Sequence, residues 1–196
     1  MNLTDIRRNL AYRITDPLVG TLSKSGITPN ALTLINLALS IVAACVIATS
    51  HFLLGGVLVL VSGLFDLLDG ALARFTKQST NFGAILDSTV DRLSEAAILC
   101  GLLIWYIPQG ASLEIVLIFA ALIGSFLVSY IRARAEGLGW QCQAGLFTRA
   151  ERVIVLAIGL LINQIFIALC VLVVFVFTTV VQRLVYLRKQ AKDGGD

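Results

Sequence analysis

The feature that most constrains this chain is a set of four aspartates inside segments that are otherwise apolar enough to lie in a lipid bilayer. They occupy the two ends of the stretch DLLDGALARFTKQSTNFGAILDSTVD, which runs from Asp66 to Asp91. An ionised aspartate at the centre of a spanning helix costs roughly 2.5 to 3.5 kcal/mol on insertion scales, and such residues usually line a polar cavity. We therefore expect the four carboxylates to share one site.

The spacing of the aspartates places them on helix faces. Asp66 and Asp69 are three residues apart, while Asp87 and Asp91 are four apart, so each pair lies on one face of a helix. If residues 75–82 form the turn of a helical hairpin, Asp66 comes level with Asp91, and Asp69 comes nearly level with Asp87. The spacing thus predicts that the carboxylates meet face to face.

Four acids without a basic residue on the same faces would repel one another, so the cluster predicts a bound cation. Oxygen-only ligands favour hard divalent ions such as Mg²⁺ or Mn²⁺, and two metals roughly 3.5 to 4 Å apart recur in phosphoryl transfer. The single histidine, His51, is far from the cluster in the sequence, which argues against zinc. Beside the acids, Gly70 and Ala73 leave room for a ligand, and Arg74 adds a fork that fits phosphate. Buried acids satisfied by hydroxyls, or a cation path through a transporter, are the alternatives.

A second group of charged residues surrounds the start of a later apolar segment. Thr148 and Glu151 have the spacing of a capping box, so a helix is expected to begin there. Arg149 and Arg152 then fall in its first turn, where the helix dipole disfavours cations. Arginines beside free backbone N–H groups make a good anion site, and Arg183 would complete it. Alternatively, these arginines only anchor the helix ends at the membrane surface by their positive charge.

The composition excludes an ordinary soluble domain, because 58% of the 196 residues are hydrophobic. We predict an all-α, polytopic membrane protein with one membrane domain over residues 26–190. An amphipathic juxtamembrane helix is expected over residues 1–25, and a frayed tail over residues 191–196. The six expected spans are residues 29–50, 52–75, 82–107, 112–136, 149–163 and 165–187.

The distribution of charge indicates how these spans are oriented. All fifteen Lys and Arg residues fall on one side of the six spans, and the turns on the other side carry none. The positive-inside rule assigns the basic side, and with it the aspartates, to the cytoplasmic face of an inner membrane. Because the basic residues lie at helix ends, nucleic acid is not expected as a partner. Small residues at four-residue spacing between 120 and 129 predict close packing, either on another helix or on a second protomer.

Read as a pattern, D-x2-D-G-x2-A-R-x8-G-x3-D-x3-D resembles the signature of the CDP-alcohol phosphatidyltransferase family. The resemblance implies a homodimeric membrane enzyme that uses an alcohol to displace CMP from a CDP-linked lipid, with two divalent metals. It implies that all four aspartates hold metal and that Asp91 is also the general base. A second segment, G-x-T-P-N-x-x-T at residues 26–33, is similar to one that borders the nucleotide in that family. The expected nucleotide-binding residues are Asn30, Thr33, Asp66, Asp69, Gly70, Ala73, Arg74, Thr80 and Gly83.

The choice of acceptor follows from a resemblance to one branch of the family, the phosphatidylinositol-phosphate synthases. The segments SYIRARAE, TRAER and VQRL match positions that bind the acceptor phosphate in that branch. With the first-turn arginine added, the expected acceptor site consists of Ser129, Arg132, Arg149, Arg152 and Arg183. Inositol phosphate is therefore the expected acceptor. Glycerol 3-phosphate, as used by a phosphatidylglycerophosphate synthase, and a cation transporter are the alternatives. The donor is a CDP-linked lipid with diacyl or ether-linked tails.

Overall fold

The computed structural model describes residues 18–20, 22–142, 144–145 and 147–194, and these form helices without a strand. The helices are α2 (Pro29–Ala48), α3 (Phe52–Phe75), α4 (Asn81–Tyr106), the 3-10 helix η1 (Ile107–Gln109), α5 (Ser112–Gly137), α6 (Arg149–Leu161) and α7 (Ile165–Gly194). The all-α class is confirmed. Most of the amphipathic helix expected over residues 1–25 lies outside the described residues and stays a prediction.

Three of the helices begin at a threonine, as local sequence signals predict. The backbone N–H of Thr148 donates to Oε2 of Glu151 at 2.7 Å, and this reciprocal arrangement is the expected capping box. The other two caps satisfy backbone N–H groups in the first turn through their hydroxyls. These caps are Thr28 for α2 and Thr80 for α4.

The two aspartate-bearing helices, α3 and α4, are joined by a short turn but scarcely touch each other. Instead, α2 packs closely against both of them. The α2 and α4 backbones meet at Gly101, where a Cβ atom would lie 2.5 Å from the carbonyl oxygen of Ala44. The structure differs from the expected hairpin in one respect: α3 and α4 each pack on α2 rather than closely on each other.

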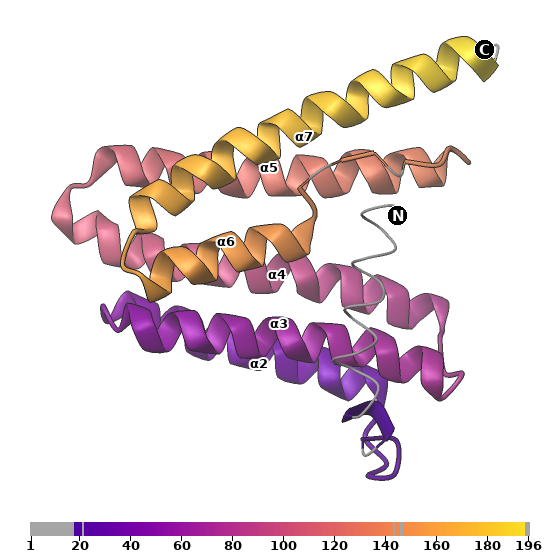
Figure 1. Cartoon of the computed structure of the whole chain (residues 1–196), viewed down its shortest axis with the longest axis horizontal. Helices are drawn as coiled ribbons and strands as arrows, with labels where there is room; N and C mark the ends of the chain where they lie inside the picture. Colours follow the sequence, from indigo (N-terminus) through magenta and orange to yellow (C-terminus); the bar gives the residue numbers. More distant parts are fainter. Residues whose placement is uncertain (1–17, 21, 143, 146, 195–196) are drawn as a thin grey trace.

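The rest of the bundle is formed by α5, α6 and α7. Figure 1 shows α5 and α7 on one side, α2 and α3 on the other, and α4 and α6 between them. The small-residue face of α5 packs on α7, because a Cβ atom at Gly124 would lie 2.5 Å from Cγ1 of Val176. Of the two partners left open by the sequence, Gly124 therefore meets a helix of its own chain.

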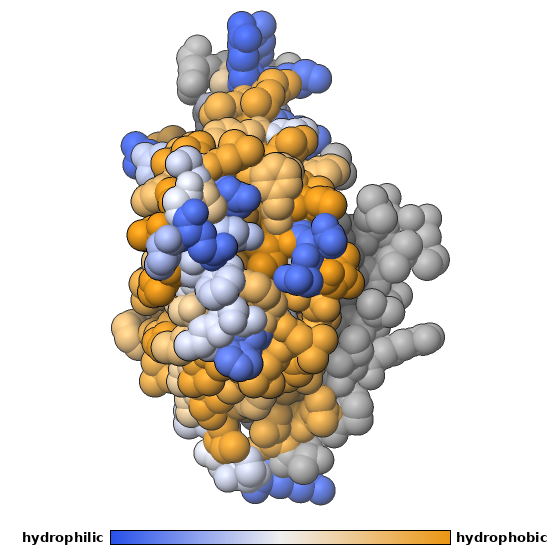
Figure 2. Space-filling model, turned by 90° about the vertical axis from the view of Figure 1, so that its left-hand side faces the viewer, coloured by the Kyte–Doolittle hydropathy of each residue, from blue (hydrophilic) through white to orange (hydrophobic). Residues whose placement is uncertain are grey.

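Among the described residues, four helices are long and apolar enough to cross a membrane: α2, α3, α5 and α7. The spans expected at α4 and α6 do not meet those criteria. The first 15 residues of α4 carry four charged residues, and α6 has only 13 residues, too few to cross the apolar layer of a bilayer alone. Six spans thus remain a prediction. Figure 2 shows an outer surface that is mostly hydrophobic around a smaller hydrophilic area, as expected where lipid replaces water.

Candidate metal and substrate site

Three of the four aspartates form a carboxylate triad between α3 and α4. Oxygen atoms of Asp66, Asp69 and Asp87 all lie within 4.8 Å of one another. Asp69 is buried, and the other two are partly exposed. Carboxylate oxygens within this distance of one another fit Mg²⁺ or Mn²⁺, which take oxygen ligands. The triad is thus a site for a divalent cation, and it lies where the spacing of the aspartates predicts.

Polar side chains of α2 orient the two aspartates of α3. The hydroxyl of Thr33 donates to Oδ2 of Asp69 at 2.7 Å, and Nδ2 of Asn36 donates weakly to Oδ1 of Asp66 at 3.4 Å. Thr33 was expected beside the nucleotide, and its hydroxyl here contacts a metal-site carboxylate. Such outer contacts fix the direction of a ligating oxygen and tune its affinity for metal.

These α2 contacts continue into the interior and were missed from the sequence. Asn36 is fully buried and accepts a hydrogen bond from the hydroxyl of Ser62 in α3. That hydroxyl lies 2.7 Å from the hydroxyl of Ser40, which is also fully buried. A signal was present, because polar residues 33, 36 and 40 recur at three- and four-residue spacing along an otherwise apolar helix.

The fourth aspartate, Asp91, is paired with an arginine from another helix. Nη1 of Arg149, the first residue of α6, lies 2.9 Å from Oδ1 of Asp91 and also forms an ion pair with Oδ1 of Asp66. The acids have no basic neighbour on their own helix faces, as the sequence indicates, but α6 supplies one. Arg149 was expected at the acceptor phosphate, and the structure pairs it with the carboxylates.

A cleft of about 550 Å³ opens beside the triad, between α2, α3 and α4. Gly83 lets the start of α4 approach α2, since a Cβ atom there would lie 3.3 Å from Oδ1 of Asn30. Asp87 also lines the cleft, so it is continuous with the metal site. Of the nine residues expected at the nucleotide, all except Asp66 line it: Asn30, Thr33, Asp69, Gly70, Ala73, Arg74, Thr80 and Gly83.

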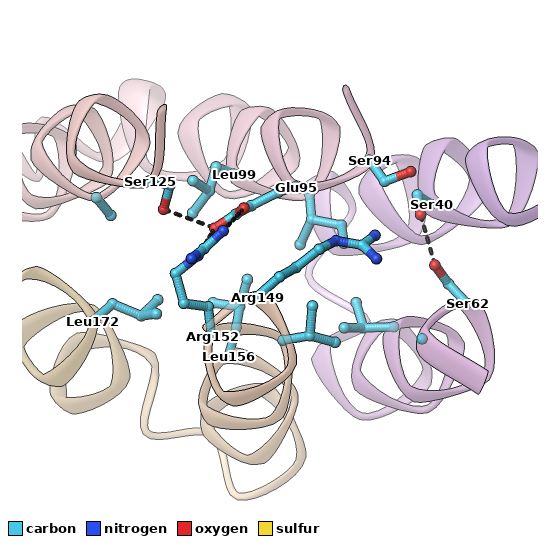
Figure 3. Close-up of a pocket in the computed structure, with 15 residues that line it drawn as sticks. Ser40, Ser62, Ser94, Glu95, Leu99, Ser125, Arg149, Arg152, Leu156 and Leu172 are labelled. Atoms are coloured by element: carbon cyan, nitrogen blue, oxygen red, sulfur yellow. Dashed lines mark hydrogen bonds and ion pairs between the residues drawn. The ribbon is translucent and has the colours of Figure 1, made fainter. Parts of the chain in front are cut away.

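Behind the triad, a buried ion pair joins α4 to α6. Nε and Nη2 of Arg152 donate to the two carboxylate oxygens of Glu95 at 2.7 and 2.8 Å, and Ser125 of α5 donates to the same carboxylate at 2.8 Å. Figure 3 shows this group, with the Arg149 guanidinium pointing away from that of Arg152. Glu95 was missed, although it lies four residues after Asp91 and continues the spacing of the acids.

The remaining residues expected at the acceptor phosphate lie near the ends of α5 and α7. Arg183 is buried and donates to the backbone carbonyl oxygens of Ala144 and Val128. Arg132 is exposed and pairs with Glu136 at 2.8 Å. The charges of Arg132 and Arg152 act on Arg183, so these three cations lie in one region. Ser129, on α5, is partly exposed. Arg149 is the one residue of the expected acceptor site that pairs with the metal-site carboxylates instead.

The buried pair gives a stability prediction. Glu95→Ala leaves the Arg152 guanidinium buried without its carboxylate, so we expect a loss of about 3 to 5 kcal/mol in the free energy of unfolding. Ser125→Ala is the control, because it removes one hydrogen bond to the same carboxylate and should cost only about 1 to 3 kcal/mol. Denaturation of the purified proteins in detergent measures both. Equal stability of the two variants would contradict a strong ion pair.

Comparison with known proteins agrees with this geometry. The sequence model of the CDP-alcohol phosphatidyltransferase family matches residues 26–183. The chain is 36% identical over 188 residues to the phosphatidylinositol phosphate synthase of Mycobacteroides abscessus, covering 91% of this chain and 86% of that protein. It is 38% identical over 175 residues to the archaetidylinositol phosphate synthase of Pyrococcus horikoshii, covering 89% and 90%.

Solved structures share the fold. The crystal structure of Mycobacterium tuberculosis phosphatidylinositol phosphate synthase with CDP-DAG bound has a TM-score of 0.79 and 34% identity, over 88% of this chain and 92% of that one. The same enzyme in complex with manganese and citrate gives a TM-score of 0.78 at 33% identity, over 87% of each chain. The likeness therefore extends to most of the helical bundle.

Proposed function

The chain belongs to the CDP-alcohol phosphatidyltransferase family, and from this premise we propose that it transfers the phosphatidyl group of a CDP-linked lipid to inositol phosphate with release of CMP. The observation that carries the proposal is the cleft in which the expected nucleotide residues and the metal carboxylates meet. Relatives named for phosphatidylinositol phosphate and for archaetidylinositol phosphate both match the chain, so the proposal covers a diacyl or an ether-linked donor.

In the proposed reaction, an acceptor hydroxyl attacks the phosphorus that carries the lipid. A new P–O bond forms to the acceptor, and the P–O bond to CMP breaks. Asp66, Asp69, Asp87 and Asp91 would hold two divalent cations, which would neutralise negative charge on the diphosphate and on the leaving CMP. Asp91 takes the proton of the attacking hydroxyl as general base. Thr33 keeps the Asp69 carboxylate directed at the site.

The choice of a phosphorylated acceptor rests on three cations, one each from α5, α6 and α7. The charges of Arg132 and Arg152 act on Arg183, and a phosphate gives these cations a negative charge that a neutral alcohol lacks. The buried Glu95 holds the Arg152 guanidinium in a set orientation, which favours preorganised recognition of a phosphate. The names of two relatives, phosphatidylinositol phosphate synthase and archaetidylinositol phosphate synthase, support the same acceptor.

We place the enzyme in the inner membrane with its site facing the cytoplasm. The support comes from the sequence, in which all Lys and Arg residues fall on the side of the six expected spans that also carries the aspartates. Soluble acceptor and metal would reach the site from that side, while the lipid donor keeps its tails in the membrane. The homodimer implied by the family resemblance stays a prediction.

The acceptor is tested by CMP release from purified protein with a CDP-linked lipid and several alcohols. We expect turnover with inositol phosphate and none with free inositol, because the arginines lose charge-assisted bonds worth roughly 1.5 to 3 kcal/mol each. Arg132→Ala should raise the KM for inositol phosphate about tenfold and leave the KM for the CDP-lipid unchanged. Arg134→Ala is the matched control, since this residue is also exposed on the last turns of α5.

Three outcomes of this assay would contradict the proposal. Turnover with glycerol 3-phosphate and none with inositol phosphate would make the chain a phosphatidylglycerophosphate synthase. Turnover with free inositol alone would remove the role given to the arginines. A chain that releases no CMP with any acceptor would not be a transferase of this family's kind.

A further inference from the structure

Arg149 stands at an unfavourable place in its helix and is held there by carboxylates. It is the first residue of α6, where the helix dipole disfavours a cation. Its side chain is only 17% exposed, and its guanidinium pairs with Asp66 and Asp91. These ion pairs offset the dipole and the loss of solvent. The position of Arg149 therefore depends on the negative charge of the metal site.

A divalent cation would bind some of the same carboxylates. Asp66 belongs to the triad with Asp69 and Asp87, and its carboxylate also pairs with Arg149 through Oδ1. Oδ1 of Asp91 is buried and makes no hydrogen bond, but it lies 2.9 Å from Nη1 of Arg149. A guanidinium at ion-pair distance occupies part of each carboxylate, and its positive charge repels a second cation placed against the same oxygens.

We infer that Arg149 is a resident counter-cation of the carboxylate cluster and competes with the divalent cation for Asp66 and Asp91. Metal binding displaces the guanidinium from both carboxylates, and loss of the metal returns it. Arg149 and Asp66 both line a groove of about 690 Å³ between α3 and α6, so the space beside their ion pair is not filled by other side chains. The inference rests on the divalent-cation site of the proposed function and assigns Arg149 to it.

Metal binding measured without substrate tests the competition. Mn²⁺ is titrated into purified protein, and the free ion is followed by its electron paramagnetic resonance signal. Arg149→Gln removes the competing charge at ion-pair distance, so we expect Mn²⁺ to bind about tenfold more tightly than to the wild type. Arg149→Lys keeps the charge but loses the fork that bridges two carboxylates, so its affinity should lie between the two. Arg134→Gln removes one exposed positive charge elsewhere and should stay within about twofold of the wild type.

Thermal unfolding gives a second readout that does not need turnover. In EDTA, Arg149→Gln leaves Asp66 and Asp91 without the cation that pairs with them, so its Tm should fall below that of the wild type. Added Mn²⁺ should then raise the Tm of this variant by more than it raises that of the wild type.

The outcomes separate this inference from the function on which it rests. If Mn²⁺ binds the wild type and its affinity falls in Arg149→Gln or Arg149→Lys, Arg149 supports the metal site. That result would overturn the competition. The proposed function would survive that result. Failure of the wild type to bind Mn²⁺ at all would overturn the metal centre and this inference together.

Discussion

Asp69→Ala is expected to reduce CMP release by about 10³-fold or more, the scale on which loss of charge stabilisation in an active site acts. Asp69 is the buried member of the triad, and its carboxylate is fixed by the hydroxyl of Thr33. Its removal leaves the cation with fewer ligands and the remaining carboxylates with uncompensated repulsion. The measurement is CMP release at saturating Mg²⁺ or Mn²⁺.

Thr33→Val is the control for this variant, because it keeps the ligand and removes the hydrogen bond that orients it. An outer-contact variant of this kind should lose about 10- to 100-fold in metal affinity or activity, clearly less than Asp69→Ala. EDTA should abolish turnover of the wild type, and added Mg²⁺ or Mn²⁺ should restore it. Full activity in EDTA would refute metal dependence.

Asp91→Asn is expected to bind the CDP-lipid and yet lose transfer. The amide keeps an oxygen at the metal but cannot take the proton of the acceptor hydroxyl. General-base catalysis is typically worth about 10² to 10⁴ in rate, so kcat should fall by that factor. The KM for the CDP-lipid should change little, since the triad and the cleft are untouched. Steady-state CMP release at varied donor and acceptor measures both quantities.

Ser94→Ala is the matched control for Asp91→Asn, because Ser94 is buried on the same helix and contributes no carboxylate. It should keep kcat within a few-fold of the wild type. Near-normal turnover of Asp91→Asn would show that another group accepts the proton. A loss of CDP-lipid binding equal to the loss of kcat would instead make Asp91 a ligand only.

The metal site is formed by residues of α3 and α4, and α2 packs against both helices. Residues three or four positions apart share a helix face by geometry alone, so the pairing of Asp66 with Asp69 follows from their numbers. The short turn after α3 then returns the chain so that Asp87 lies beside them. That α2 packs against both α3 and α4 does not follow from either spacing, because it depends on close contacts such as Gly101 with Ala44.

The sequence by itself determined the features that depend on neighbours in the chain. These are the helical class, the threonine caps, the carboxylate triad across one short turn, and most of the residues that line the cleft. The physical reason is that helix periodicity, capping and the cost of charge in an apolar segment all act over a few residues.

Only the tertiary structure decided which partner each buried charge takes. Arg149 and Arg152 look alike in the sequence, as two arginines in one helical turn, yet they are three positions apart and their guanidinium groups point different ways (Figure 3). One meets Asp66 and Asp91, and the other meets Glu95, which lies 57 residues away in the chain. A buried charge takes the opposite charge that the packing of other helices brings within reach, and that packing is set by contacts distant in sequence.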